Sequence, residues 1–208
     1  MLLSTAFLPP AEWFALAARD ITLSDGRVIP SVVQLEAHEN FIKQSWRSRC
    51  LIGTSSGSEA ILVPVVHGES LITSVKIDYS TPWLVRAERA IDTAYRSAPF
   101  YEHYRDELFS ILESRHETLW ELNLQLINYL FRCLHLPAGL CNTSCWTPPG
   151  ELADDYRYAL SPKLPSPLTV GPYYQVFAHR RGFIPGLSII DLLFGEGPEA
   201  AAFLYLRQ

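Results

Sequence analysis

The apolar residues at the start of the chain follow a strand, helix, strand pattern. Residues 2–8 are largely apolar and predict a short strand. A helix is expected from Pro10 to Ala18, because proline is tolerated in a first turn, where its missing N–H donor costs nothing. Residues 31–38 carry apolar side chains at every second position, which is the period of a strand. This order predicts a βαβ unit with a parallel pair of strands.

Further strands are expected after this unit. Residues 49–53 and 59–66 flank a loop of serine, threonine and glycine at residues 54–58, a pattern that predicts a β-hairpin. Residues 71–77 are expected to form another strand. Residues 140–146 are expected to return to the sheet.

From residue 80 the apolar positions recur at helical spacing. Thr81 is expected to cap a first helix, with Pro82 at its first position and the last turn at Ala98. A second helix is expected over residues 99–113.

A third helix is expected to begin at Ser114 and Glu117, which have the spacing of a capping box, and to end at Leu136. Its 117–135 segment is apolar nearly all round, which indicates a buried central helix. Asn123 lies within this segment. A buried asparagine needs hydrogen-bond partners. We therefore favour the interpretation that Asn123 is a core residue whose polar side chain is hydrogen-bonded.

The last third of the chain begins with a proline-rich loop over residues 147–172, around a short element at residues 154–159, and ends in helices. One helix is expected over residues 188–194 with Gly195 as its stop, and a last one from Pro198. Asp191 interrupts an apolar run. With Ser188 it has the spacing of a capping box, and the alternative is a buried functional carboxylate.

These elements predict an α/β fold. It comprises a small, partly parallel sheet with an N-terminal βαβ unit and a β-hairpin, packed on a bundle of about four to six helices. A chain of 208 residues is long enough to bury about 70% of its unfolded surface, so one domain over residues 1–208 is expected.

Composition excludes several classes of protein. Hydrophobic residues make up 48% and charged residues 19%, which excludes disorder, and no apolar run is long enough for a membrane span. The net charge of −5 is spread evenly, so no nucleic-acid partner is expected. The apolar start lacks a preceding basic segment, and a cytoplasmic location is expected.

The densest polar segment is EAHENFIKQSWRSRC, residues 36–50. Lys43, Arg47 and Arg49 place three cations within seven residues, with Gln44 and Trp46 between them. Arginine and lysine suit a phosphate or carboxylate, and a tryptophan face suits a base or sugar ring. The segment therefore predicts an anion-binding wall; the alternative is a solvated loop.

Candidates for proton transfer lie beside this segment. His38 and Glu36 stand where the second strand ends, and histidine titrates near neutral pH. Asp191 is the third candidate. No standard catalytic signature is present: there is no G-x-S-x-G elbow, Walker A loop, dinucleotide fingerprint or H-E-x-x-H pair.

The cysteines are expected to be buried and inert. The spacing of Cys133, His135, Cys141 and Cys145 does not match structural zinc modules, so no metal site is assigned. Cys50 lies close enough in sequence to His38 for a Cys–His pair to be the alternative. The sequence leaves the cofactor and the oligomeric state open.

Four segments together resemble one family. They are HENFIKQSWRSRC, FLPPAEWFALA, the Leu122-Asn123 pair and YYQVFAHRRGFIPGLSIIDLLFGEGPEA. A Lys-x-x-Trp-x-x-Arg loop followed by Leu-Ser-Ile-Ile-Asp-Leu-Leu-Phe is similar to the WbqC-like protein family. The family's shared positions map here to Lys43, Trp46, Arg47, Arg49, Gln175, Ser188 and Asp191. This chain departs from relatives at Ser4-Thr5 and over residues 162–172.

The resemblance implies a bacterial transferase of surface-polysaccharide (O-antigen) synthesis or modification, with glycyl or aminoacyl transfer to a sugar as the candidate reaction. Its expected substrate is a small anionic molecule: a phosphorylated or nucleotide-linked sugar, or an activated acyl donor. Lys43, Gln44, Trp46, Arg47, Arg49 and Gln175 would bind it, and His38, Glu36 or Asp191 would move the proton. The alternative is a non-catalytic protein that binds an anionic metabolite or a partner of an envelope pathway.

Overall fold

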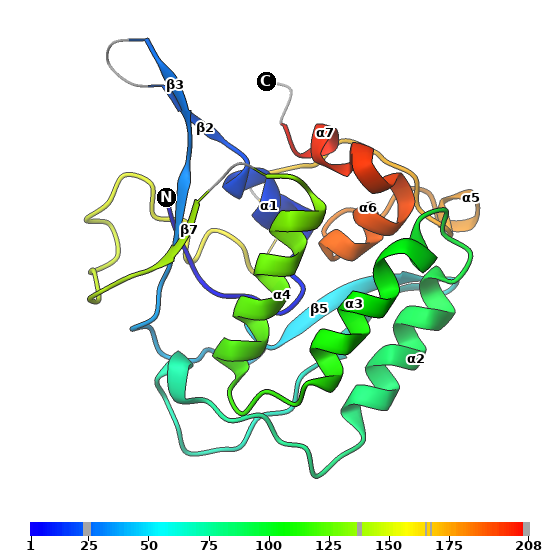
Figure 1. Cartoon of the computed structure of the whole chain (residues 1–208), viewed down its shortest axis with the longest axis horizontal. Coiled ribbons are helices and arrows are strands. Elements are labelled where there is room, and N and C mark those ends of the chain that lie inside the picture. The colour runs from blue at the N-terminus through cyan, green and yellow to red at the C-terminus, as the bar shows by residue number, and fades with distance from the viewer. Residues whose placement is uncertain (23–25, 137–138, 165, 167, 206–208) are drawn as a thin grey trace.

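A three-stranded parallel sheet joins two strands from the start of the chain to one from its second half. The structure is a computed structural model that describes residues 1–22, 26–136, 139–164, 166 and 168–205 (Figure 1). Strands β1 (Leu2–Leu3), β4 (Val32–Leu35) and β7 (Gly139–Asn142) run parallel in the order β1-β4-β7. Helix α1 (Ala11–Ala17) lies between β1 and β4 in sequence. The predicted βαβ unit and the return of the chain to the sheet at β7 are confirmed, with shorter strands than expected.

Two antiparallel hairpins accompany the sheet. Strands β2 (Asp20–Thr22) and β3 (Val28–Pro30) form an arm that projects from the rest of the molecule in Figure 1. Strands β5 (Arg49–Thr54) and β6 (Gly57–Leu62) form the predicted hairpin, with Thr54 opposite Gly57 at its turn. The predicted fold class is therefore confirmed.

The strand predicted over residues 71–77 is wrong. A 3-10 turn, η1, spans Ile72–Ser74. Ile72 and Val75 are both fully buried. A spacing of three places both side chains on the core side of a tight turn, whereas a strand would send them to opposite faces.

Three helices form the layer beside the hairpin: α2 (Trp83–Tyr95), α3 (Tyr101–Glu113) and α4 (Leu119–Cys133) (Figure 1). Helix α4 buries most of its side chains, as its apolar sequence predicts. The predicted cap at Thr81 is wrong, because Pro82 occupies the N-cap position of α2 and no side chain caps this helix.

The capping box of α4 begins four residues later than predicted. Thr118 Oγ1 accepts from the Glu121 amide, and Glu121 Oε2 accepts from the Thr118 amide, each at 3.2 Å. Glu117 instead forms an ion pair of 2.8 Å with Lys76. Thr118 is extended, the Glu117 carbonyl accepts from the Ile77 amide and the Leu119 amide donates to the Val75 carbonyl, so the helix begins at Leu119 and not at Ser114.

Replacing Thr118 by alanine should lower the free energy of unfolding by about 0.5–2 kcal/mol, because the Glu121 amide loses its acceptor. Ser114→Ala is the matched control and should change it by less than about 0.5 kcal/mol, since Ser114 is exposed and outside the box. Urea denaturation measures both values. Equal losses in the two variants would contradict this assignment of the helix start.

The C-terminal region contains α5 (Ala178–Arg181), α6 (Ile189–Glu196), the 3-10 turn η2 (Gly197–Glu199) and α7 (Ala200–Leu204). The predicted stop at Gly195 is wrong, because α6 continues to Glu196 and the positive φ of 56° belongs to Gly197. Gly195 is required for another reason: the Tyr174 carbonyl oxygen lies 2.5 Å from where a Cβ would stand.

The buried apolar side chains form one contiguous cluster that includes residues of α1, α4 and α6. The described residues of 147–172 contain no helix or strand, so the predicted loop is confirmed but the short element expected at residues 154–159 is wrong: only an isolated bridge joins Asp155 to Leu2. Within the described ranges, no helix is long and apolar enough to cross a membrane. The extent of the domain, residues 1–208, stays a prediction.

Candidate functional site

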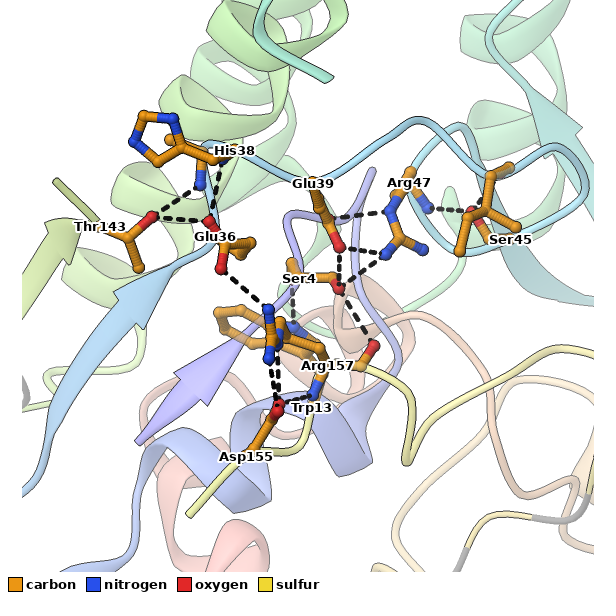
Figure 2. Close-up of polar contacts among 12 residues, drawn as sticks. Ser4, Trp13, Glu36, His38, Glu39, Ser45, Arg47, Thr143, Asp155 and Arg157 are labelled. Atoms are coloured by element: carbon orange, nitrogen blue, oxygen red, sulfur yellow. Dashed lines mark hydrogen bonds and ion pairs between the residues drawn. The ribbon is translucent and has the colours of Figure 1, made fainter. Parts of the chain in front are cut away.

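Polar side chains gather where the three parallel strands end (Figure 2). Ser4 follows β1, Glu36 follows β4 and Thr143 follows β7. The carboxyl ends of parallel strands meet at one edge of a sheet, and ligands of α/β proteins bind outside this edge. The edge is therefore the candidate site.

Glu36 is fully buried and both of its carboxylate oxygens accept hydrogen bonds. Its Oε1 accepts from the His38 amide at 2.9 Å and from Thr143 Oγ1 at 2.8 Å. Its Oε2 accepts from Arg157 Nη1 at 2.9 Å. Arg157 in turn donates to Asp155 at 2.9 and 2.6 Å, and these bonds lower the pKa of the Asp155 carboxyl. Glu36 thus joins β4, β7 and the loop after β7.

A second buried ion pair lies beside the first (Figure 2). Arg47 donates from Nε to Glu39 Oε1 at 2.9 Å, and from Nη2 to Glu39 Oε2 and to Ser4 Oγ, the latter at 2.8 Å. Arg47 is 4% and Glu39 2% exposed. Burial raises the pKa of the Glu39 carboxyl, and the bonds from Arg47 oppose that rise. Arg47 is therefore occupied inside the protein, which contradicts its predicted place in an anion-binding wall.

The backbone of the Arg47 loop is fixed from three further directions. The carbonyl oxygens of Trp46, Arg47 and Ser48 each accept one hydrogen bond at 2.8 Å. The donors are the amides of Phe7 and Val63 and the side chain of Asn123. The prediction that the buried Asn123 side chain is hydrogen-bonded holds for its Nδ2 only, because its Oδ1 has no partner among the described residues.

The loop leaves three side chains at a spacing of three residues available to a ligand. Lys43 is exposed, and Trp46 and Arg49 are half-buried. Arg49 Nε is buried and has no hydrogen-bond partner in the described part of the chain. Gln44 is also exposed, with a φ of 57°. His38 is exposed, and Figure 2 shows its imidazole pointing away from the Glu39–Arg47 pair.

Trp46 also borders two hollows. The smaller is lined in part by Ser4, Thr5 and Arg157. The larger, of about 330 Å³, is lined in part by Glu12. Trp46 therefore connects the sheet edge to a neighbouring cavity.

Asp191 and Gln175 lie in a separate buried cluster. Burial raises the pKa of Asp191 from 3.8 to about 6, and hydrogen bonds from Tyr173, Tyr95 and Gln175 oppose that rise. Asp191 Oδ2 has no partner at hydrogen-bond distance within the described ranges.

The capping-box interpretation of Asp191 is wrong. Ser188 does cap α6, since its side chain accepts from the Ile190 amide. Its own amide, however, donates to the Leu51 carbonyl at 2.7 Å and is not available to Asp191. Asp191 is thus a buried carboxylate, the alternative left open by the sequence.

The structure brings Glu36, His38, Trp46 and Arg47 to the sheet edge and keeps Asp191 and Gln175 elsewhere. Sequence reasoning missed Glu39, Ser4 and Arg157. Glu39 carried a usable signal, an acid next to His38 in the same polar segment. Arg157 carried none, because it reaches Glu36 from 121 residues away.

The prediction of buried cysteines is confirmed for Cys50 and wrong for Cys141 and Cys145, which are exposed. Cys50 is fully buried, and burial raises its pKa. A nucleophilic cysteine needs the opposite shift. Among the described residues, no group of three or more His, Cys, Asp or Glu side chains could hold a metal ion.

Comparisons with known proteins find one family model and a curated relative. The model of the WbqC-like protein family matches residues 7–159. A protein of Mycobacterium tuberculosis (strain ATCC 25618 / H37Rv) named "Uncharacterized protein Rv1507c" is 31% identical in an alignment 202 positions long; the alignment covers 81% of this chain and 85% of that protein. No solved structure is significantly similar to the chain.

Proposed function

The chain belongs to the WbqC-like protein family, and from this premise we propose that it is a transferase that binds a small anionic donor at the carboxyl edge of its parallel sheet. The donor is a phosphorylated or nucleotide-linked sugar, or an activated acyl group. The process is bacterial surface-polysaccharide (O-antigen) synthesis or modification, with glycyl or aminoacyl transfer to a sugar as the candidate reaction.

One observation carries the proposal: the loop is fixed internally by Arg47, while Lys43, Trp46 and Arg49 stay available. Arg49 offers a planar fork of donors to a phosphate or carboxylate, and Lys43 offers a point charge. Trp46 offers a flat face to a base or sugar ring. A loop already held in place costs little entropy when it binds.

His38 is the proposed group for proton transfer. It is exposed, and its backbone amide is held by Glu36 at 2.9 Å. Because three donors already occupy Glu36, its proposed part is to position His38. Because these three hydrogen bonds occupy Glu36, they also favour a second candidate function: a non-catalytic protein that binds an anionic metabolite or an envelope-pathway partner. Turnover separates the two.

Calorimetric titration with inorganic pyrophosphate and with UDP-glucose tests the binding step. Arg49→Gln should weaken affinity by about 10- to 150-fold, because one charge-assisted hydrogen bond contributes about 1.5–3 kcal/mol. Arg89→Gln is the matched control, since Arg89 is an exposed arginine on α2, and should bind like the parent. Equal affinities of parent and Arg49→Gln would contradict the proposal.

A transfer assay then separates the two functions. Parent protein, a nucleotide-sugar or aminoacyl-phosphate donor and a sugar acceptor are incubated, and the mass of the acceptor is followed. A gain in mass that is lost in His38→Ala supports the transferase. Binding without any gain in mass supports the non-catalytic candidate.

A further inference from the structure

The cavity beside Trp46 has apolar walls and one charged group. Its volume of about 330 Å³ lies at the small end of ligand pockets. Leu51, Leu160, Leu164 and Leu168 contribute apolar lining. Among the lining residues that the structure describes, Glu12 is the one with a charged side chain.

Glu12 is a buried carboxylate with an unused oxygen. It lies in the first turn of α1 and is 2% exposed. Its Oε1 accepts from the Gly186 amide at 3.1 Å. Its Oε2 is buried and has no partner within the described ranges. Burial raises the pKa of this carboxyl, and no cation contributes to lowering it.

An unpaired buried carboxylate is costly, and a cationic ligand group removes that cost. Buried charges in proteins are normally paired, and an ammonium hydrogen-bonded to a carboxylate is among the stronger polar contacts. The leucine side chains suit an apolar body, and the Trp46 face suits both a flat ring and a nearby cation. A neutral or anionic ligand of the same shape would leave Glu12 uncompensated.

We propose that this cavity is a binding site for a small monocyclic amine, whose ammonium group pairs with Glu12 and whose ring lies against Trp46 and the leucine walls. The site is distinct from the donor loop formed by Lys43 and Arg49. Trp46 is common to both, so the two sites are neighbours.

Three probes of matched shape test the charge requirement: 2-phenylethylamine, 2-phenylethanol and 3-phenylpropionate, each titrated calorimetrically into the full chain. The amine should bind about tenfold or more tightly than the alcohol, and the carboxylate weakest. Equal binding of amine and alcohol, or no binding of the amine, would overturn the proposal.

Variants test the residue assignment. Glu12→Gln keeps an acceptor for the Gly186 amide and should weaken the amine about tenfold or more while leaving the alcohol unchanged. Ser161→Ala is the control in the same cavity and should change neither probe. Leu168→Trp leaves Glu12 intact but fills the cavity, and it should abolish binding of both. Unchanged amine affinity in Glu12→Gln or in Leu168→Trp refutes the site.

The proposal and the donor loop can fail separately. Arg49→Gln should bind the amine like the parent, and Glu12→Gln should bind pyrophosphate like the parent. Amine binding without pyrophosphate binding refutes the donor loop alone. The reverse result refutes the amine site alone.

Discussion

Replacing Arg47 by alanine should lower the free energy of unfolding at pH 7 by about 3–5 kcal/mol, the usual cost of removing one partner from a buried ion pair. The substitution leaves the Glu39 carboxylate buried without its cation and removes the Nη2 donor to Ser4. Urea denaturation measures the loss. Lys43→Ala is the matched control in the same loop and should stay within about 0.5 kcal/mol of the parent, because Lys43 is exposed.

The loss in Arg47→Ala should shrink as the pH is lowered. Burial already raises the pKa of Glu39, and removing Arg47 removes the bonds that oppose this rise. An acid with a raised pKa in the folded state binds its proton more tightly when folded, so it destabilises the protein as the pH rises through that pKa. Arg47→Ala, Glu39→Gln should recover part of the loss at pH 7. An Arg47→Ala protein as stable as Lys43→Ala would refute the buried pair.

Replacing Asp191 by asparagine should raise the free energy of unfolding at pH 7 by up to about 3 kcal/mol. Burial raises the Asp191 pKa from its ordinary 3.8 to about 6, and a pKa difference of this size corresponds to about 3 kcal/mol. The folded state of the parent loses this amount as the pH rises from 3.8 through about 6. The gain from asparagine should therefore be full above this range and absent below it.

Asp155→Asn is the matched control for Asp191→Asn, with the opposite sign. Its hydrogen bonds with Arg157 lower the pKa of Asp155, so its ionised form stabilises the fold and its replacement should destabilise the protein at pH 7. Stability is measured by denaturation at several pH values between 4 and 8. A gain in Asp191→Asn that does not depend on pH, or a loss, contradicts the assignment.

A carboxylate that lowers the free energy of unfolding by this much is a candidate functional residue. Perturbed pKa values cluster at functional sites, and stability is commonly traded there for activity. The Asp191 cluster includes Tyr173, whose pKa is raised by burial and by the charges of both Asp191 and Glu12.

The parallel sheet could be predicted because its signal is local. Alternation over residues 31–38 and the strand, helix, strand order need no distant information. The start of α4 could not be predicted in the same way, because Ser114 and Thr118 both precede a glutamate by three residues. The choice between them depends on hydrogen bonds of residues 117–119 to Val75 and Ile77, which are distant in sequence.

The same difference between local and distant information decides what could be predicted of the candidate site. The cationic loop at Lys43, Arg47 and Arg49 is visible as a charge pattern. Arg47 is the internal anchor because it contacts Ser4, 43 residues away, and the buried Glu39. Burial is a tertiary property, so the sequence could locate the loop but could not separate the roles of Arg47 and Arg49.

The central claim is that Arg47 anchors the loop while Arg49 binds the ligand. Thermal unfolding of the parent and of Arg49→Gln, each with and without inorganic pyrophosphate, tests it most directly. A ligand that binds only the folded state raises the melting temperature. The account predicts equal melting temperatures without pyrophosphate, and an increase with pyrophosphate in the parent alone. An equal increase in both proteins, or an unliganded Arg49→Gln that melts as early as Arg47→Ala, would contradict it.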